Sequence, residues 1–519
     1  MKTLHHKIAI STCTAIFCLF FVGCKNFLDT KPSDFYSPEE YYNTEAQLNT
    51  ALVGVYDPLG SSELYSYNIS SMFGTEADEG YYNRSSAEGP QIYDFTSAHT
   101  RIRTTWQKLY QGIHRANLVL ANVNKPEMST SARNIIIGEA KFLRAFYYFL
   151  LVTNWGGVPL VTQPTESPID NGVARNTDKE VYEFILAEMK EAEAKVRDIE
   201  AVGNAGRVNK SAVRGILARV CLHMAGYPLN DHSKYAEARD WVKKVMDSGH
   251  ALNPDYKQIF INYAQDKYDL KESIWEVEFW GNGSDTYSEA GWIGVRLGVA
   301  TSDVTLGFRY GIIRTTEKYY HLFEDSDVRR EWTIAPYKYS GKTPVNHGPS
   351  DIYDRDIAKW RREYELDKST SLTAQNFPLL RYSDVLLMYA EAETMASNTA
   401  PSPQAFEAIN QVRRRAFALP IHTPDPMVDL SGLDHEQFMK VIKDERSREL
   451  GFEGLRKHDL IRWGDFLTVM KDMEVELSIG GAPSFAVWAF TNVQPKHVLF
   501  PIPVREMALN KQLTQNPGW

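Results

Sequence analysis

The chain of 519 residues has few cysteines, no cluster of basic residues and none of the short motifs that mark common enzyme classes. Its formal net charge is -9, and without a basic run a nucleic-acid partner is not expected. HExxH, GxSxG and a Cys/His nucleophile arrangement are absent, and the GNG turn at 281–283 has no Walker-type Lys after it. We therefore expect no cofactor and predict no metal ligands.

The first 23 residues are typical of a bacterial signal peptide. Lys2 and Lys7 begin it, and an apolar stretch too short for a membrane span ends in Phe21-Val22-Gly23-Cys24. This ending resembles a lipobox with Phe at the third position before the Cys, where Leu is usual. A plain secretory signal with an incidental Cys is the alternative. The lipobox predicts that Cys24 is lipidated and anchors the chain to a membrane.

Removal of residues 1–23 leaves a mature chain almost without cysteine. Two of the four cysteines leave with the signal, and only Cys24 and Cys221 remain. A disulfide framework is therefore not available to stabilise the fold. The signal also carries two lysines and no acidic residue, so the mature chain is more acidic than the full one.

Residues 434–463 contain two carboxylates in a well-defined helical pattern. Asp434 and Gln437 form a capping box, and Glu445 and Glu449 follow at positions i and i+4, on one face of the helix. Such a pair could be a catalytic acid and base or a metal site. It could instead anchor ion pairs, since buried charges need partners. The second interpretation is favoured because the stretch supplies counter-charges in Arg446, Arg448, Arg456 and Arg462.

Helical periodicity dominates both sides of a less regular middle. The N-terminal helix is expected to begin at Ser37 and continue through Tyr56. Further helices are predicted at 104–154 (a hairpin), 178–197, 209–225, 234–248, 381–392, 402–416 and 434–450. Antiparallel pairs of this length resemble tetratricopeptide units without the strict consensus. The predicted fold is mainly α, with helical hairpins, a few short strands and a large loop-rich insertion.

Aromatic residues gather in two irregular stretches, 60–100 and 250–375. The chain has 28 Tyr, 24 Phe and 11 Trp, more than a core alone requires. Residues 274–280 have the composition of a strand, and a glycine-rich loop follows. Rings that stack on sugars beside groups that bind hydroxyls would form an oligosaccharide site, although the same rings could simply cover the core. The nominated ligand-binding residues are Tyr81, Tyr82, Asn83, Arg84, Trp280, Tyr287 and Trp292.

Five separated segments resemble signatures of one protein family. They begin with the opening after Cys24 (KNFLDTKPSDFY), followed by GEAKFLRA at 138–145 with NWGGVPL, and RYSDVLLMYAEA at 381–392. The fourth, in 445–463, has the pattern ERxxELxFEGxRxxDLxRW, and the fifth combines PIP at 501–503 with NKQLTQNPG at 510–518. Together they resemble the SusD/RagB family of Bacteroidetes outer-membrane nutrient-binding lipoproteins.

The resemblance implies one SusD-like domain over residues 24–519. Its helical scaffold would span about 36–250 and 376–464, its irregular ligand-binding part about 60–100 and 250–375, and its closing segment 465–519. The family implies a non-catalytic, surface-exposed lipoprotein of the outer membrane that captures oligosaccharide or polysaccharide. It would pass this ligand to a SusC-like TonB-dependent transporter as its partner.

Three alternatives to glycan capture are open at this stage. RagB-like members serve peptide uptake, so the ligand could be a peptide. A secreted glycoside hydrolase could use Glu445 with Glu449, or Asp78 with Glu79, as paired carboxylates. A helical adaptor without a ligand would leave the loop aromatics unexplained.

Overall fold

The computed structural model describes residues 41–73, 77–165, 172–280, 290–368, 372–397 and 399–519. The helices before the irregular middle are α2 (Glu45–Tyr56), α3 (Thr100–Asn122), α4 (Thr130–Trp155), α5 (Asp178–Glu193), α6 (Ile199–Val202), α7 (Lys210–Ala225), α8 (Lys234–Met246) and α9 (Tyr256–Ala264). Those within it are α10 (Ile293–Leu297), α11 (Glu317–Leu322) and α12 (Val328–Thr333). Those after it are α13 (Tyr382–Ser397), α14 (Pro403–Ala416), α15 (His435–Leu450), α16 (Arg456–Arg462), α17 (Phe466–Ile479), α18 (Trp488–Asn492) and α19 (Val504–Leu509).

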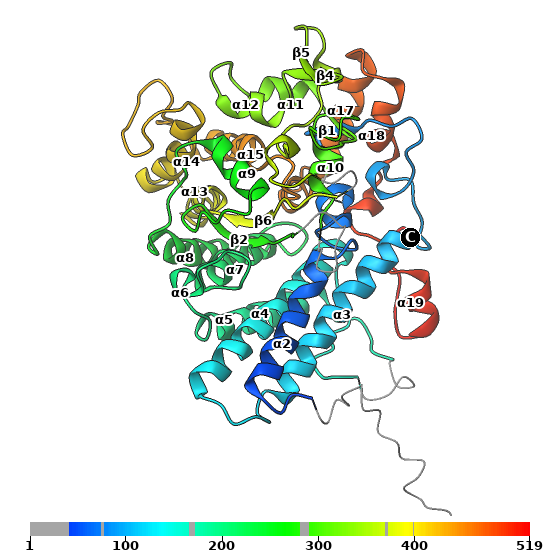
Figure 1. Cartoon of the computed structure of the whole chain (residues 1–519), viewed down its shortest axis with the longest axis vertical. Coiled ribbons are helices and arrows are strands. Elements are labelled where there is room, and N and C mark those ends of the chain that lie inside the picture. Colours follow the sequence, from blue (N-terminus) through cyan, green and yellow to red (C-terminus); the bar gives the residue numbers. More distant parts are fainter. Residues whose placement is uncertain (1–40, 74–76, 166–171, 281–289, 369–371, 398) are drawn as a thin grey trace, which may run out of the picture.

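The long helices pack in a continuous series. Helix α2 lies on α3 and α4, α4 on α5, α5 on α7 and α7 on α8 (Figure 1). Helix α8 then packs on α13, which contacts α14 and α15, although residues 247–381 separate α8 from α13 in sequence. The predicted helical scaffold with an insertion is confirmed. None of the described helices is both long and apolar enough to cross a membrane.

Side-chain caps define several helix starts. The predicted capping box of Asp434 and Gln437 is present at α15. The expected helix from Ser37 is not continuous, because residues 41–44 are not helical and Tyr42 has a φ of 56°. Helix α2 begins instead at Glu45, after a capping box formed by Thr44.

The described strands form three antiparallel two-stranded sheets. They are β1 (Gly80–Tyr82) with β3 (Ile313–Thr315), β2 (Ser273–Val277) with β6 (Phe377–Arg381), and β4 (Tyr337–Ser340) with β5 (Thr343–Asn346). The second sheet joins the beginning of the insertion to its end, and β6 leads directly into α13.

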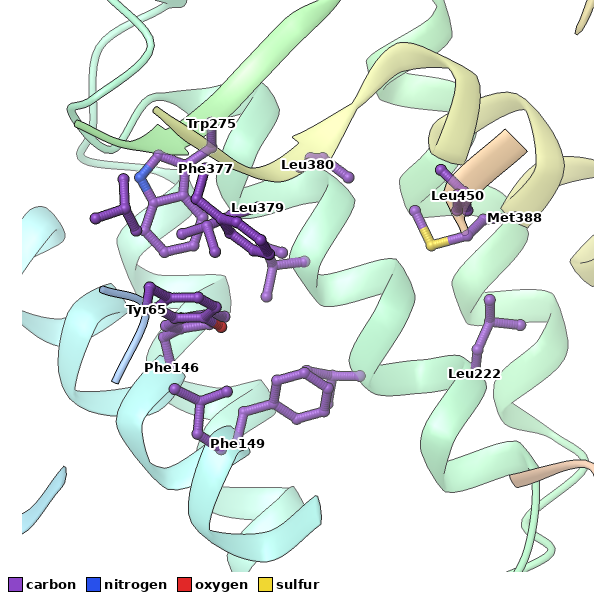
Figure 2. Close-up of a cluster of buried hydrophobic side chains, with 14 of the residues drawn as sticks. Tyr65, Phe146, Phe149, Leu222, Trp275, Phe377, Leu379, Leu380, Met388 and Leu450 are labelled. Atoms are coloured by element: carbon purple, nitrogen blue, oxygen red, sulfur yellow. The ribbon is translucent and has the colours of Figure 1, made fainter. Parts of the chain in front are cut away.

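A buried aromatic cluster fixes the second sheet on the scaffold. The Trp275 ring of β2 lies 5.0 Å from Phe142 and 4.8 Å from Phe146, measured between ring centroids, and both phenylalanines belong to α4 (Figure 2). Trp275 is fully buried. Burial of an aromatic ring against two others is among the larger single contributions to a core. The base of the insertion is therefore held by the hydrophobic effect as well as by strand pairing.

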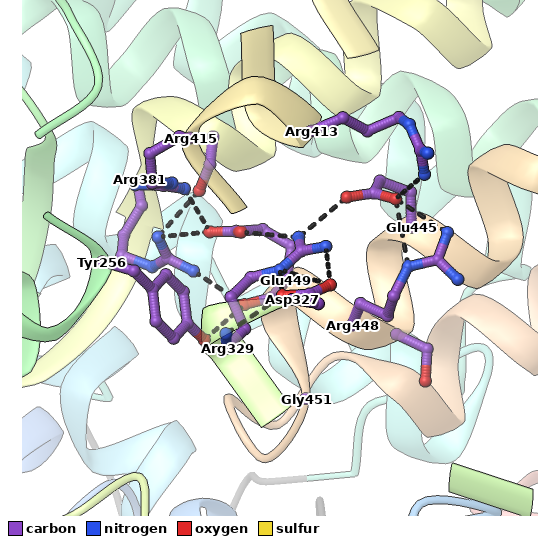
Figure 3. Close-up of polar contacts among 12 residues, drawn as sticks. Tyr256, Asp327, Arg329, Arg381, Arg413, Arg415, Glu445, Arg448, Glu449 and Gly451 are labelled. Atoms are coloured by element: carbon purple, nitrogen blue, oxygen red, sulfur yellow. Dashed lines mark hydrogen bonds and ion pairs between the residues drawn. The ribbon is translucent and has the colours of Figure 1, made fainter. Parts of the chain in front are cut away.

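The two glutamates predicted on one face of α15 lie at the centre of an arginine–glutamate lattice (Figure 3). Glu445 and Glu449 are fully buried, and Arg329 of α12 contacts both, at 2.7 and 3.1 Å. The other members are Arg413 and Arg448 on Glu445, and Arg381 and Arg415 on Glu449. The ion-pair interpretation is confirmed. Neither carboxylate has access to a substrate.

Neighbouring ion pairs join α15 and α16 to the scaffold. Arg446 contacts Asp384 of α13 at 2.7 Å and Asp459 of α16 at 2.8 Å. Arg462 contacts Asp459 at 2.8 Å and also pairs with Glu391 of α13. Of the arginines named from the sequence, Arg448 therefore joins the lattice, while the others pair with different carboxylates.

The arginines of the lattice and burial have opposite effects on the pKa of Glu449. Burial alone would raise the pKa of Glu449, but Arg415, Arg381 and Arg329 together lower it to about 2. The charged form is thus strongly favoured in the folded chain. Removal of one partner would leave uncompensated charge in a buried region of low dielectric.

We expect Glu449→Gln to destabilise the protein strongly, because Arg381 and Arg415 would lose a buried counter-charge. Breaking a buried ion pair lowers the free energy of unfolding by about 3–5 kcal/mol. Chemical denaturation of protein lacking residues 1–24 measures this change. The control is Glu183→Gln on α5, whose side chain is 57% exposed and which should change stability by less than about 0.5 kcal/mol. Equal stability of the two variants would contradict the role assigned to the lattice.

A second prediction concerns Glu276 in β2, whose carboxyl accepts hydrogen bonds from Ser273 and Asn376. Burial raises the pKa of Glu276 to about 7. An acid with a raised pKa contributes most to stability below its unfolded value, near 4.5, and this contribution is lost as the pH rises toward 7. Stability of Glu276→Gln relative to the unmodified protein should therefore increase between pH 4.5 and 7 and then level off. A pH-independent difference in denaturation midpoints would refute this.

Candidate functional site

Strand β1 carries the first of the nominated residues. Tyr81 pairs with Arg314 of β3, and its ring is 1% exposed with its hydroxyl donating to the Tyr353 carbonyl at 2.6 Å. Tyr82 points to the opposite face, as alternate strand residues do, and is partly exposed. Its hydroxyl accepts a hydrogen bond from Arg296 at 2.7 Å. Tyr81 thus presents no face to a ligand in this structure, whereas Tyr82 lies at the surface.

Asn83 and Arg84 hold the backbone of residues 310–312. The Asn83 N–H donates to the Ile312 carbonyl at 2.8 Å, and Arg84 donates to the Tyr310 carbonyl at 2.7 Å. Both side chains remain partly exposed. The side chain of Tyr310 is 43% exposed beside them. Arg84 therefore orders a surface loop in addition to presenting a cation.

Trp292 belongs to an aromatic and cationic cluster centred on Tyr67. The two rings meet edge to face at 5.6 Å between centroids, and the backbone N–H of Trp292 donates to the Ser66 carbonyl at 2.9 Å. The guanidinium carbons of Arg101 and Arg296 lie 4.6 and 4.5 Å from the centre of the Tyr67 ring. Cation–π contacts of this kind favour one ring orientation. The cluster joins the 60–100 stretch to the glycine-rich loop of the insertion.

Trp280 stands at the outer end of the β2 segment. Its side chain is 61% exposed, while the preceding Phe279 is buried and its N–H donates to the Asn376 side chain at 2.9 Å. The exposed indole thus directly follows a buried residue whose backbone is held by a hydrogen bond. Tyr287 lies outside the described residues.

The structure brings two of the nominated residues, Tyr82 and Trp292, to the Tyr67 cluster. Tyr82 contacts it through Arg296, and Trp292 packs directly on the Tyr67 ring. Arg101 and Arg296 were not nominated from the sequence. Arg296 follows Trp292 by four residues on the short helix α10, and this spacing was an available signal; Arg101 on α3 offered none.

The second carboxylate pair considered for catalysis precedes β1 and is buried. Asp78 pairs with Arg456 of α16 at 2.7 Å and with Lys318 at 2.9 Å. Glu79 accepts a hydrogen bond from the Ser447 hydroxyl at 3.0 Å, and burial raises its pKa to about 7. Since α15 and α16 contribute these partners, neither carboxyl is placed to act on a substrate. Across the described ranges, no group of three or more His, Cys, Asp or Glu is arranged to hold a metal ion.

Two family models match the chain. The model described as "SusD family" matches residues 259–519. The model described as "Starch-binding associating with outer membrane" matches residues 26–222. The two matches together include most of the described residues.

Individual relatives agree over almost the whole length. SusD-like protein P25 of Formosa agariphila is 26% identical, with 95% of each chain covered. The crystal structure of a SusD homologue from Bacteroides thetaiotaomicron has a TM-score of 0.86 at 29% identity, covering 93% of this chain and 98% of that one. A laminarin-binding SusD-like protein has a TM-score of 0.70 at 25% identity, covering 92% of this chain and 100% of that one. The resemblance of the five sequence segments is thereby confirmed, and the chain belongs to the SusD family.

Proposed function

We propose that this chain is a non-catalytic, lipid-anchored protein of the outer-membrane surface that captures oligosaccharide or polysaccharide. It would deliver this ligand to a SusC-like TonB-dependent transporter. The relative that binds laminarin and the family described as starch-binding support a glycan as the ligand class. The observation that carries the proposal is the exposed indole of Trp280 on a rigid base.

The proposed site combines stacking rings with hydrogen-bonding side chains. Trp280 would stack on the apolar face of a sugar, and Trp292 would supply a second ring held by Tyr67. Asn83 and Arg84 would bind hydroxyls from the neighbouring loop. The remaining nominated residues are Tyr82, which is partly exposed, Tyr287, and Tyr81, whose buried ring would support the strand.

Such a site is consistent with the modest affinities that capture requires. Dissociation constants from millimolar to micromolar correspond to about 4–8 kcal/mol. Two or three stacked rings with a few hydrogen bonds can supply this free energy. Weak binding also permits release of the ligand to a transporter.

We expect Trp280→Ala combined with Trp292→Ala to weaken polysaccharide binding by roughly tenfold or more, because two stacking surfaces are lost. Affinity electrophoresis of protein lacking residues 1–24, against a panel of polysaccharides that includes laminarin and starch, measures the change. Trp280→Ala alone should leave the thermal midpoint unaltered, since its ring is largely exposed.

The matched control for this experiment is Trp241→Ala on α8. Its indole is partly exposed beside Lys244, on the scaffold and away from the insertion. Retardation that is lost in the double variant and kept in the control would support the site. Equal retardation of the double variant and the unmodified protein would exclude these tryptophans. Binding of peptides in place of any polysaccharide would favour the alternative ligand class.

The anchor is tested separately. Cys24→Ala in the full chain removes the only thiol that the lipobox pattern offers for acylation. We expect the variant to leave the membrane fraction and to lose incorporation of a labelled fatty acid, because the thiol that would carry the anchoring lipid is gone. An unmodified chain and Cys221→Ala, a buried cysteine, serve as controls. Persistent labelling of the Cys24 variant would contradict the lipoprotein assignment.

A further inference from the structure

An open pocket of about 790 Å³ lies beside the Tyr67 cluster, between residues 62–68, residues 88–101 and the beginning of α3. Arg101 and Asn68 line it, and the Arg101 guanidinium also contacts the Tyr67 ring on which Trp292 packs. The pocket is thus adjacent to the proposed stacking site and is large enough for a sugar residue.

Hydrogen-bond acceptors dominate the pocket. Glu63, Glu88 and Asp94 line it, and Glu63 has its nearest cation, Lys108, at 4.0 Å. In the described part of the chain, no Lys or Arg forms an ion pair with Glu88 or Asp94. Against these three carboxylates the lining has one guanidinium, that of Arg101, which donates to the Asn68 side chain at 3.1 Å and keeps its positive charge.

A buried acceptor without a partner lies next to the pocket lining. Gln91 is 6% exposed, and its Nε2 atom donates to the Glu88 carbonyl at 2.6 Å. Its Oε1 atom has no hydrogen-bond partner within the described residues. This oxygen lies 3.3 Å from the point that a β-carbon on Gly89 would occupy, and His99 Nε2 lies 3.0 Å from the same point. Gly89 and His99 line the pocket, whereas Gln91 packs next to them and is not part of the lining.

His99 does not offset the negative charge of the pocket. Burial lowers the pKa of His99, the Arg101 charge lowers it further, and Glu88 opposes both. The imidazole is therefore neutral near pH 7 and adds no cation to the pocket. Its Nδ1 atom is buried without a partner in the described structure.

We propose that this pocket is a subsite for an uncharged sugar of the captured glycan and that its carboxylates exclude sulfated and uronate glycans. The inference rests on the proposed glycan-binding function and specifies the ligand class. Sugar hydroxyls can donate to the carboxylates and to His99. Charge-assisted hydrogen bonds of this kind are stronger than neutral ones. A sulfate or carboxylate offers no donor and would meet like charge at the rim.

The test is the double variant Glu88→Gln with Asp94→Asn, which preserves shape and removes both charges. We expect its retardation by a neutral polysaccharide to weaken about tenfold, because two charge-assisted hydrogen bonds become neutral. Binding to chondroitin sulfate and polygalacturonate, which the unmodified protein should not retain, should appear or strengthen. Both residues are exposed, so the thermal midpoint should not change.

The charge-matched control is Glu183→Gln with Asp247→Asn, two exposed acids on the scaffold. It removes the same net charge at a distance from the pocket and should behave like the unmodified protein. Anionic binding that rises equally in both double variants would show a bulk charge effect and would overturn the inference.

The remaining outcomes separate the two proposals. If the unmodified protein binds a neutral polysaccharide and the pocket variant binds it equally well, the subsite assignment fails and the proposed function stands. If an anionic polysaccharide retains the unmodified protein as strongly as a neutral one does, the subsite assignment also fails and the proposed function also stands. If the unmodified protein binds no polysaccharide and instead binds basic peptides, both the function and the subsite are overturned.

Discussion

Buried positive charge needs buried negative charge, and this requirement organises the chain around α15. Glu445 and Glu449 are enclosed by arginines from α12, β6, α14 and α15 itself. Each of these elements must be in place before both carboxylates have their full set of partners. A partly assembled lattice would hold an unpaired ion in a medium of low dielectric, which is strongly unfavourable. The lattice therefore favours a single arrangement of the elements that meet there.

Helices α15 and α16 extend this constraint to the candidate site. Asp78 and Glu79 are bound by Arg456 and Ser447, and β1 begins at the next residue. Strand β1 pairs with β3, and Arg84 then holds the backbone of 310–312. The surface that carries Tyr82 is thus joined to α15 and α16 by a short series of polar contacts. A ligand would meet a surface whose position is fixed by the core, not by the loops alone.

Sequence patterns revealed the local features and missed the long-range ones. The i, i+4 spacing placed Glu445 and Glu449 on one buried face. Apart from the first helix, which begins at Glu45 and not at Ser37, the limits of the predicted helices agreed with the structure to within a few residues. The partners Arg329 and Arg415 could not be identified, because no local pattern shows which distant cation will meet a given acid. Tyr81 and Tyr82 could not be separated either, since a strand of three residues has no readable period. The contact of Trp292 with Tyr67 depends on packing between segments more than 200 residues apart in the chain.

The pairing of β2 with β6 has a consequence for how related chains can diverge. Because the two strands close the insertion at its base, added or removed residues within it change mainly the entropy of a closed loop, by only about 0.6 kcal/mol per doubling of length. Wholesale exchange is nevertheless restricted, since Arg329 and Lys359 inside the insertion form ion pairs with Glu445, Glu449 and Glu453 of the scaffold. Variation can therefore accumulate at the tips of these loops, whereas any transplanted insertion must bring two cations to the same positions.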